Sequence, residues 1–304
     1  MLFLTGHLGP VRTLAYAPGD ASTLASASAD ATVRLWNPLT RQNWATFRTE
    51  WDLTYPLVFS PDGGRLPTAA RQGNLCIWDV AMEWPLVTLP LQGEAFVECV
   101  ACLPDGERLV AAGMTLTRGW GRDWGVLELF RLGEPKSIRH RRFGNNIRCL
   151  ALSADGQTLV VAGLNRGTVT LLSPEDFQQR RPDLGFFRGA AGCLALSSVG
   201  KECMAVGNGG VVELWDVSAG KRQALLKGHW GAVRALTYSP DGRLLLSGGK
   251  DGTVRLWDLD AGKERAAYNW DLGPVHAVAF APDGMTAAAA GETGAILVWD
   301  VEMS

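Results

Sequence analysis

The sequence predicts an all-β fold built from seven copies of one sheet-forming unit. Residues 6–37 and residues 228–258 read almost alike, and self-similarity at a fixed period indicates a repeat architecture. Short apolar runs alternate with tight-turn signals in each copy, which is typical of strands joined by turns. The 3.6-residue spacing of amphipathic helices does not occur along the chain.

Each repeat ends at an aromatic or apolar residue that recurs at a regular interval. The intervals are 42 or 43 residues, except for one interval of 52 residues between the second and third repeats. The recurring residues are Trp36, Trp78, Phe130, Leu172, Trp215, Trp257 and Trp299. The repeats therefore end near Asn37, Asp79, Arg131, Ser173, Asp216, Asp258 and Asp300.

A tight turn lies at the same offset in every repeat, with the sequences APGD, SPDG, LPDG, SADG, SSVG, SPDG and APDG in chain order. Proline sets φ near the value that a turn needs, and glycine accepts positive φ. Each turn is predicted to join two strands. A second turn then leads to a further strand such as TVRLWD at residues 253–258.

The repeat begins with Gly-His and ends with Trp-Asp in its most complete copies, and this pattern resembles the WD-repeat family. Four repeats end in a literal Trp-Asp, at Trp78, Trp215, Trp257 and Trp299. The resemblance covers the whole chain and implies one domain over residues 1–304. That domain would be a seven-bladed β-propeller of four-stranded antiparallel blades around a central channel.

The two chain ends are predicted to complete one blade together. The seventh repeat stops at ILVWDVEMS, one strand short of a full blade, while LFLTGH at the start matches ALLKGH before the sixth repeat. Residues 2–5 should therefore form the outer strand of the last blade and close the ring. Such pairing removes an open sheet edge, which would otherwise favour aggregation.

Composition indicates an ordinary globular protein, with 47% hydrophobic residues, 20% charged residues and a net charge of -2. This balance gives no bulk attraction to nucleic acid or to an anionic membrane. The first residues lack the basic start and the apolar run of a signal peptide, and no run approaches the length of a membrane helix. We expect a cytoplasmic, monomeric chain whose six cysteines are mostly reduced.

The family resemblance also implies a buried hydrogen-bond chain in each complete blade. In the first repeat its members would be His7, Ser28, Asp30 and Trp36. In the sixth repeat His229, Asp251 and Trp257 remain, but Gly249 occupies the serine position. A serine, a histidine and an aspartate also resemble a hydrolase triad. Because they sit at repeat-locked positions without a GxSxG motif, the structural interpretation is preferred and no catalysis is expected.

The cysteines are predicted to be structural, and we expect no metal and no cofactor. Cys99, Cys149 and Cys193 occupy one equivalent position on the first strand of their repeats. Cys99 and Cys102 form a CxxC pattern, but an odd separation on a strand points the two side chains to opposite faces. That arrangement is wrong for a shared metal or a disulfide.

An insertion in the third repeat is the first candidate binding surface. Nine extra residues fall in the loop between the second and third strands, which by the family resemblance projects from the top face. Tryptophan and arginine are enriched in binding hot spots. Alternatively, Trp124, or Trp120 as well, folds back as a plug for a blade without its usual tryptophan. The candidate residues are Arg118, Trp120, Arg122, Asp123 and Trp124.

The loops that lead into the blades supply the second candidate surface. Trp51, Trp230 and Trp270 lie in these loops, and one equivalent position after them holds Arg12, Arg148, Arg234 and His276, with Glu98 breaking the pattern. By family resemblance this position lies near the top opening of the channel. A ring of cations there suits a carboxylate or phosphate group on a peptide. Solvated rim charges are the plain alternative.

Two arginine clusters are the third feature, with the sequence RHRR at residues 139–142 followed by Arg180 and Arg181. They fall on or beside outer strands, where charge protects an exposed edge. Nucleic-acid binding through these arginines of blades 3 and 4 is an alternative, although the chain shows no groove-entering helix or RNA-stacking motif.

We therefore predict a non-catalytic scaffold that binds a protein or peptide with the top face and channel mouth, without membrane association. The alternatives are an enzyme with a site in the channel mouth, and nucleic-acid binding as above. Fold alone does not name the partner.

Overall fold

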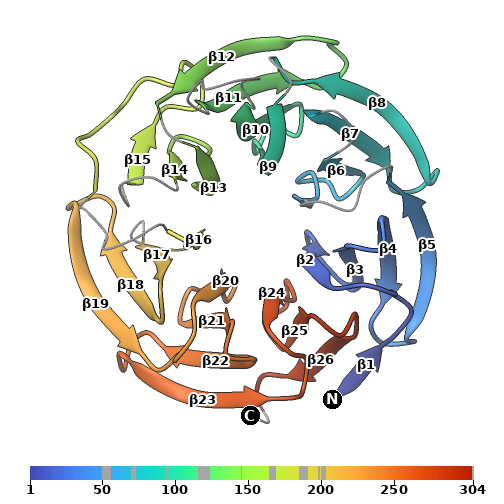
Figure 1. Cartoon of the computed structure of the whole chain (residues 1–304), viewed down its shortest axis with the longest axis vertical. Helices are drawn as coiled ribbons and strands as arrows, with labels where there is room; N and C mark the ends of the chain where they lie inside the picture. Colours follow the sequence, from blue (N-terminus) through green and yellow to red (C-terminus); the bar gives the residue numbers. More distant parts are fainter. Residues whose placement is uncertain are drawn as a thin grey trace. The chain divides into compact units, whose positions relative to one another are not determined.

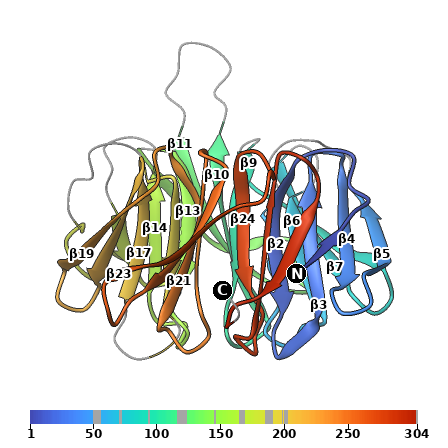
Figure 2. The same cartoon turned by 90° about the horizontal axis from the view of Figure 1, so that it is seen from below.

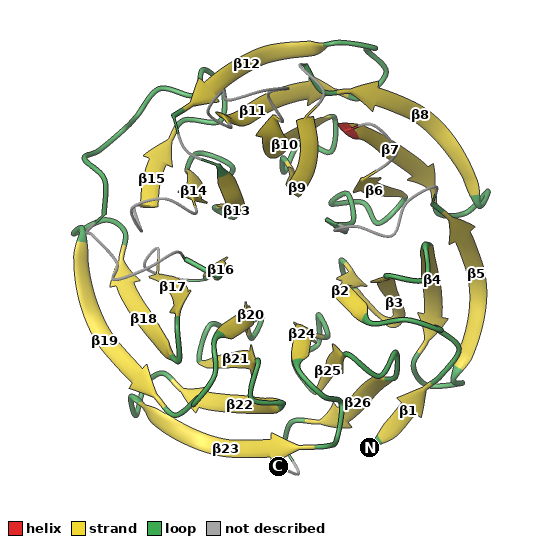
Figure 3. Cartoon of the chain, in the orientation of Figure 1, coloured by secondary structure: helices red, strands yellow, loops and turns green. Residues whose placement is uncertain are grey.

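The computed structural model describes residues 1–49, 56–69, 73–92, 95–115, 124–144, 146–163, 169–184, 191–197, 199 and 203–302. These residues form seven antiparallel sheets, which we number as blades 1 to 7 in chain order (Figures 1 and 3). The all-β, seven-bladed β-propeller class is therefore confirmed. Within the described residues, no helix has the length and apolar character that crossing a membrane requires.

The chain divides into two compact units, which we describe separately. Unit 1 comprises Met1–Arg48 and Gly192–Ser304, and unit 2 comprises Thr49–Ala191. That all 304 residues act as a single domain stays a prediction.

Unit 1 contains blades 1, 5, 6 and 7. Blade 1 consists of β2 (Val11–Ala17), β3 (Asp20–Ser28), β4 (Thr32–Asn37) and β5 (Gln42–Arg48). Blade 5 consists of β16 (Cys193–Leu196), β17 (Cys203–Asn208), β18 (Val211–Asp216) and β19 (Lys221–Lys227). Blade 6 consists of β20 (Val233–Tyr238), β21 (Leu244–Gly249), β22 (Thr253–Asp258) and β23 (Lys263–Asn269). Blade 7 consists of β24 (Val275–Phe280), β25 (Thr286–Gly291), β26 (Ile296–Asp300) and β1 (Leu2–Leu4).

Unit 2 contains blades 2, 3 and 4. Blade 2 consists of β6 (Arg65–Ala69), β7 (Asn74–Asp79) and β8 (Trp84–Pro90). Blade 3 consists of β9 (Ala95–Cys102), β10 (Arg108–Thr115), β11 (Trp124–Arg131) and β12 (Ser137–Phe143). Blade 4 consists of β13 (Ile147–Leu152), β14 (Leu159–Gly163) and β15 (Val169–Leu172).

Blades 2 and 4 have three strands each among the described residues, where four were predicted. In blade 2 a single bridge between Leu57 and Thr68 lies at the position of the first strand. In blade 4 the chain after β15 makes two isolated bridges, Leu172 with Gln179 and Val169 with Leu184, at the position of the fourth strand. In both blades the remaining strand position thus carries isolated bridges instead of a continuous ladder.

The predicted pairing of the chain ends is confirmed in blade 7. Strand β1 pairs antiparallel with β26, with Leu2 opposite Val298 and Leu4 opposite Ile296. The side chain of Leu4 is buried in the core that blade 7 shares with blade 1. The N-terminal residues therefore cover the edge of the sheet that the C-terminal residues build.

The core of unit 1 lies between consecutive blades. One apolar cluster joins blades 6 and 7, and another joins blades 7 and 1. Strand β24 packs against β20 on one side and against β2 on the other (Figure 1). Because both faces of blade 7 are covered, four consecutive alanines, Ala287–Ala290, are all buried in β25. Small side chains allow this close approach of neighbouring sheets.

The turns that recur at the same offset in each repeat have the backbone geometry that their residues predict. In the blade 6 turn, Gly242 has φ of 72° and Ser239 Oγ donates to Asp241 Oδ1 at 2.5 Å. The backbone N–H of Leu244 in turn donates to Ser239 Oγ at 2.9 Å. The turn is thus closed by its own side chains, which fixes the register of β20 against β21.

Candidate protein-binding surface

The first and second strands of each blade define one end of the sheet, which we call its top end. In blade 1, Val11 at the start of β2 pairs with Ser28 at the end of β3, and Ser28 pairs with Thr32 at the start of β4. The loop before the first strand and the loop between the second and third strands therefore meet at the top end. In blade 3, β10 ends and β11 begins at this end (Figure 2).

Among the residues that the structure describes, a β-bulge lies at the top end of five blades. In blade 1, Val11 pairs with Ser28 and Thr13 pairs with Ala27, so that Arg12 is the extra residue between them. The same register shift occurs on β9, β13, β20 and β24. A bulge leaves its extra residue out of the ladder and re-aims that side chain. The extra residues, called the bulge residues here, are Arg12, Glu98, Arg148, Arg234 and His276.

In unit 1 the bulge residues of blades 6, 7 and 1 converge on one imidazole. Arg234 Nη1 lies 2.9 Å from His276 Nδ1, and Arg12 Nη1 lies 2.7 Å from His276 Nε2. Glu292, which follows β25, places its Oε2 at 2.6 Å from the same Nε2. We call Arg12, Arg234, His276 and Glu292 the bulge cluster. Sequence reasoning did not single out Glu292, because the residues at its repeat position are mixed in sign.

The bulge cluster holds its histidine neutral and carries a net positive charge. Burial is the largest cause that lowers the pKa of His276 below its ordinary 6.5, and the guanidinium groups of Arg12 and Arg234 lower it further. The hydrogen bond with Glu292 acts in the opposite direction. That same hydrogen bond is the main cause that lowers the pKa of Glu292. At pH 7 two cations therefore face one carboxylate, and the imidazole adds no charge.

Two exposed apolar side chains lie at the top ends of blades 1 and 6. Leu8 is 93% exposed and Trp230 is 80% exposed, and each follows the histidine of a Gly-His pair. Their backbones are held in place, because Leu8 N–H donates to Asp30 Oδ2 at 2.9 Å and Trp230 N–H donates to Asp251 Oδ2 at 3.1 Å. Each side chain is thus presented to solvent from an anchored backbone, four residues before a bulge arginine.

The two aspartates that anchor these backbones, Asp30 and Asp251, belong to buried hydrogen-bond chains. The serine predicted for the blade 1 chain, Ser28, was wrong. In blade 1, His7 Nδ1 lies 2.9 Å from Asp30 Oδ2, and His7 Nε2 lies 2.7 Å from Ser26 Oγ. Trp36 Nε1 donates to the same Ser26 Oγ at 2.8 Å. Ser28 instead donates to the carbonyl of Gly9 at 2.9 Å. Residues 26 and 28 share one face of β3. Because Ser28 lies nearer the turn that follows β3, its hydroxyl reaches the loop at Gly9 instead of the indole of Trp36.

Blade 6 has the complete chain, so the proposed gap at Gly249 was also wrong. His229 Nε2 lies 2.7 Å from Ser247 Oγ, and Trp257 Nε1 donates to that oxygen at 2.8 Å. His229 Nδ1 lies 3.0 Å from Asp251 Oδ2. Gly249 is required by packing, because a Cβ there would lie 2.5 Å from His229 Nδ1. Burial lowers the pKa of His229, which leaves the ring neutral between its partners.

Comparison with known proteins identifies these repeats. A family model described as "WD domain, G-beta repeat" matches residues 1–37, 220–258 and 267–300. The chain contains WD repeats. The matched residues include the first three strands of blades 1 and 6, which hold the complete hydrogen-bond chains described above, together with blade 7.

Curated relatives of this WD-repeat protein match part of its length. A coronin-like protein of Saccharomyces cerevisiae is 34% identical over 113 residues, which are 37% of this chain and 17% of the yeast protein. Periodic tryptophan protein 2 of Arabidopsis thaliana is 30% identical over 164 residues, covering 54% of this chain and 15% of the relative. A guanine nucleotide-binding protein subunit beta of Oryza sativa subsp. japonica is 26% identical over 178 residues, covering 54% and 44% respectively. The matches thus span less than half of each of these relatives.

Other predicted site residues of the WD-repeat protein have different surroundings. Trp270 is half-buried, stacked on Tyr268 with ring centroids 4.6 Å apart, and 4.7 Å from the Trp299 ring. Both of its neighbours are thus aromatic side chains of blades 6 and 7, and Trp270 is a packing residue instead of a presented one. Trp270 stands at the repeat position that Gly228 holds in the Gly-His pair of blade 6. Its large side chain fills space that the glycine leaves free. Trp51 lies outside the described residues.

The blade 3 insertion lies largely outside the described residues. Arg118, Trp120, Arg122 and Asp123 fall in this undescribed part. Trp124 begins β11, pairs with Thr115 and is 42% exposed. A residue of that exposure does not plug the blade.

In unit 2 the bulge residues form a mixed pair. Burial raises the pKa of Glu98, and the charge of Arg148 on the neighbouring blade opposes this rise. Arg148 is exposed, whereas Glu98 is half-buried. The unit 2 pair therefore has no excess of positive charge.

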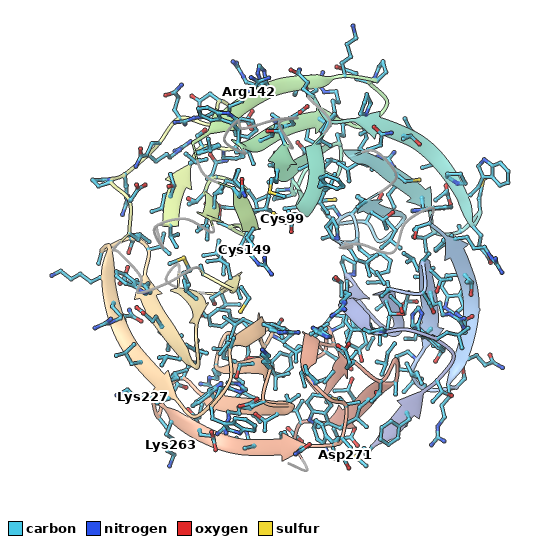
Figure 4. The ribbon with its side chains drawn as sticks, in the orientation of Figure 1. Cys99, Arg142, Cys149, Lys227, Lys263 and Asp271 are labelled. Atoms are coloured by element: carbon cyan, nitrogen blue, oxygen red, sulfur yellow. The ribbon has the colours of Figure 1, made fainter. Side chains whose placement is uncertain are left out.

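The RHRR segment of the WD-repeat protein lies on β12, where alternate arginines hold the chain that follows β15. Arg139 Nε donates to the carbonyl of Glu175 at 3.1 Å, and Arg141 Nη1 donates to the carbonyl of Phe177. His140 and Arg142 are exposed on the other face (Figure 4). Half of this basic segment thus has an intramolecular role that nucleic-acid binding would have to displace.

Four cysteines whose side chains are described are free thiols, namely Cys76, Cys99, Cys102 and Cys149. Cys99 and Cys149 lie on the first strands of neighbouring blades (Figure 4). Burial raises the pKa of Cys149 to about 12 and that of Cys99 well above its ordinary value. Because the thiolate is the reactive and metal-binding form, both thiols are unreactive at neutral pH.

Proposed function

We propose that this chain is a non-catalytic scaffold that binds a protein or peptide at the top ends of blades 6, 7 and 1. The observation that carries the proposal is the bulge cluster, in which three repeats bring Arg234, His276 and Arg12 together, with exposed Trp230 in the loop before β20 of the same unit. Hot spots of protein interfaces are enriched in tryptophan and arginine. An exposed tryptophan with an anchored backbone loses little conformational freedom on binding, which favours affinity.

The relatives support a binding role of this kind. The rice relative is by its name a subunit of a guanine nucleotide-binding protein, and therefore part of an assembly. This chain shares repeats with it but spans 44% of its length, so the partner and the assembly of that protein are not transferred. What the comparison supports is the general role of a propeller that presents loops to other proteins.

We further propose that the blade 3 insertion provides a separate contact surface in unit 2. Trp124 is exposed at the start of β11, and Arg118, Trp120, Arg122 and Asp123 precede it in the sequence. These residue types are those of a binding loop. Arg148 is exposed on the neighbouring blade and extends the set.

A reducing compartment such as the cytoplasm fits the chain. Cys76, Cys99, Cys102 and Cys149 are free thiols in the described residues, and buried free thiols are typical of intracellular proteins. We therefore include a cytoplasmic location and a monomeric state in the proposal.

Capture of partners from a lysate of the source cells tests the proposed function. Immobilised wild type is compared with Trp230→Ala, with Trp120→Ala/Trp124→Ala, and with Trp84→Ala as a matched control. Trp84 is 70% exposed on the outer strand β8, away from the top end of its sheet. We expect Trp230→Ala to lose at least one specifically captured protein by about tenfold, while Trp84→Ala keeps it.

All variants must melt at the wild-type temperature for this comparison to apply. If Trp230→Ala and the double variant both capture the same proteins in the same amounts as wild type, the proposed surfaces are wrong. Loss in the double variant alone would place binding on the insertion.

A further inference from the structure

The bulge cluster contains more hydrogen-bond donors than its own residues can satisfy. Arginine has five N–H donors and no acceptor, so Arg12 and Arg234 bring ten donors to the top end of unit 1. Within the described residues, the acceptors in the cluster are one lone pair of His276 and the carboxylate of Glu292. The side chain of His276 is 6% exposed, whereas those of Arg12 and Glu292 are 38% and 50% exposed. The donors are therefore reachable from solvent.

The contacts of His276 leave the guanidinium of Arg12 with only a shared acceptor on the ring. A neutral imidazole has one N–H and one lone pair. If Nε2–H donates to Glu292 Oε2 at 2.6 Å, then Nδ1 accepts from Arg234 Nη1 at 2.9 Å. Arg12 Nη1 then lies 2.7 Å from a nitrogen that is itself a donor. It lies 3.3 Å from Nδ1, whose single lone pair Arg234 contacts at the shorter distance of 2.9 Å. The other tautomer would set Nδ1–H against the donors of Arg234 and a lone pair against Glu292.

Glu292 does not accept a hydrogen bond from Arg12. The distance from Arg12 Nη1 to Glu292 Oε2 is 3.7 Å, beyond hydrogen-bond range. Arg12 thus shares one ring acceptor with Arg234, and its side chain is 38% exposed. An acceptor from outside the chain would give the N–H groups of Arg12 a hydrogen-bond partner of their own.

The charge of the bulge cluster selects the kind of acceptor. Two guanidinium groups and one carboxylate give a net charge of about +1 at pH 7 when His276 is neutral. A carboxylate carries one negative charge and accepts two parallel N–H bonds from a guanidinium fork. A phosphate monoester carries close to two negative charges, and its second charge would be repelled by Glu292. The cluster therefore matches a carboxylate better than a phosphate.

We propose that the bulge cluster binds a carboxylate of the partner peptide between Arg12 and Arg234, with Leu8 and Trp230 contacting apolar residues beside it. This inference rests on the proposed function, because it names the partner group that the top end of unit 1 recognises. The carboxylate comes from an aspartate or glutamate side chain or from a peptide C-terminus. Both sources present the same planar acceptor, and the experiment below distinguishes them.

Nuclear magnetic resonance of the histidine Cε1–H groups in the full-length protein tests the proposal. The chain has four histidines, so the His276 signal is assigned by its absence in His276→Gln. The probes are N-acetyl-Leu-Asp-Leu-amide, N-acetyl-Leu-Leu-Leu with a free C-terminal carboxylate, the neutral N-acetyl-Leu-Asn-Leu-amide, and inorganic phosphate. We expect at least one carboxylate peptide to shift the His276 signal saturably. The source with the lower Kd identifies whether an internal acid or a C-terminus is preferred.

Variants separate the bulge cluster from general positive charge. We expect Arg12→Gln and Arg234→Gln each to weaken carboxylate binding by about tenfold. Arg12→Lys should weaken it less than Arg12→Gln, because it keeps the charge and loses the fork. Arg243→Gln is the matched control, since Arg243 is 74% exposed and follows the turn at the other end of blade 6. In the wild type, carboxylate binding should also raise the pKa of His276, because it adds a negative charge beside the ring.

Four outcomes would overturn the inference. These are no saturable shift with either carboxylate peptide, equal affinity for the neutral peptide, tighter binding of phosphate than of both carboxylates, and an unchanged Kd in both Arg12→Gln and Arg234→Gln. Partner capture that depends on Trp230, without carboxylate binding, would leave the scaffold function standing and remove this inference alone. Carboxylate binding without any dependent partner would instead contradict the scaffold function.

Discussion

At the residue scale, a hydroxyl on the second strand decides whether the blade tryptophan is satisfied. Ser26, Thr68 and Ser247 accept the indole N–H in blades 1, 2 and 6. In blade 7 the equivalent residue is Ala289, and Trp299 Nε1 is buried without a hydrogen-bond partner in the part of the chain that the structure describes. A buried donor without a partner costs about 1 to 3 kcal/mol. The ring of Trp299 instead contacts that of Trp270, tilted by 50° at a centroid distance of 4.7 Å.

Replacing Ala289 by serine should therefore stabilise the fold. We expect Ala289→Ser to raise the free energy of unfolding by about 0.5 to 1.5 kcal/mol, because it gives Trp299 the acceptor that blades 1 and 6 have. Urea denaturation followed by tryptophan fluorescence measures this change. Ala288→Ser is the matched control, since Ala288 is equally buried on the opposite face of β25. That variant should lose about 1 to 3 kcal/mol. Equal losses in both variants would refute the explanation.

The serine was predicted at the wrong position because the sequence offers two candidates on one strand face. Ser26 and Ser28 both lie on β3 and both are buried. The distinguishing signal is present in the sequence: Ser26, Thr68 and Ser247 each precede a tryptophan by ten residues, whereas position 28 corresponds to Ala70 and Gly249. Trp270 was misplaced for another reason, since its stacking on Tyr268 and its tilted contact with Trp299 depend on which side chains of blades 6 and 7 meet.

At the element scale, the β-bulge turns a repeat position into a site. Repeat spacing showed that Arg12, Arg234 and His276 are equivalent. It did not show that each is the extra residue of a bulge, because a bulge of this type has no residue signature of its own. It also did not show that three of them meet, since their contact depends on which blades are neighbours. Glu292, in the loop after β25, contacts His276 of this group. The residue type at its position differs from one repeat to the next, so the repeat pattern did not indicate it.

The outer edge of blade 4 is a second element that spacing could not resolve. The chain after β15 makes isolated bridges instead of a fourth strand, and side chains hold it in place. Arg139 and Arg141 on β12 donate to its carbonyls, and Arg108 Nη1 donates to Glu175 Oε2 at 2.6 Å. Phe177, with φ of 56°, buries its ring in the core between blades 3 and 4. The basic strand β12 therefore has a structural use.

Removal of Arg141 should loosen this segment. We expect Arg141→Ala to increase the rate of trypsin cleavage after Arg180 by about fivefold, because local opening exposes the backbone to the protease. Arg142→Ala is the matched control, as it removes one adjacent cationic side chain from the exposed face of β12. Limited proteolysis with mass spectrometry of the fragments measures both. Equal cleavage rates in Arg141→Ala and the wild type would show that the carbonyl contact does not hold the segment.

At the scale of the whole molecule, the number of blades followed from the period, and the strand content of each blade did not. Seven turn sequences at one offset predict seven sheets whatever their loops contain. Blade 4 departs because SPEDFQQRRPDL, at residues 173–184, carries two prolines and no alternating apolar pattern. Proline removes a ladder donor, which explains isolated bridges in place of a strand. Blade 7 matched expectation because its missing strand had a visible counterpart at the other chain end.

The joining of the chain ends gives the last prediction. Strand β1 has three residues, yet Leu4 is 1% exposed in the core between blades 7 and 1, whereas Phe3 on the other face is 43% exposed. Leu4→Ala should lower the free energy of unfolding by about 2 to 5 kcal/mol, as for other buried leucines. Phe3→Ala should change it by less than about 1 kcal/mol. Deletion of residues 1–5 removes both the leucine and the ladder to β26, so it should lower the melting temperature by several degrees.

Differential scanning calorimetry of the three variants and the wild type measures these changes. The deletion should melt no higher than Leu4→Ala, because it also exposes the backbone edge of β26. That edge can pair with another chain, so the deletion should show concentration-dependent association that neither point variant shows. A deletion variant that melts at the wild-type temperature and stays monomeric would mean that β1 contributes nothing to closing blade 7, and Leu4 would then be buried without stabilising the fold.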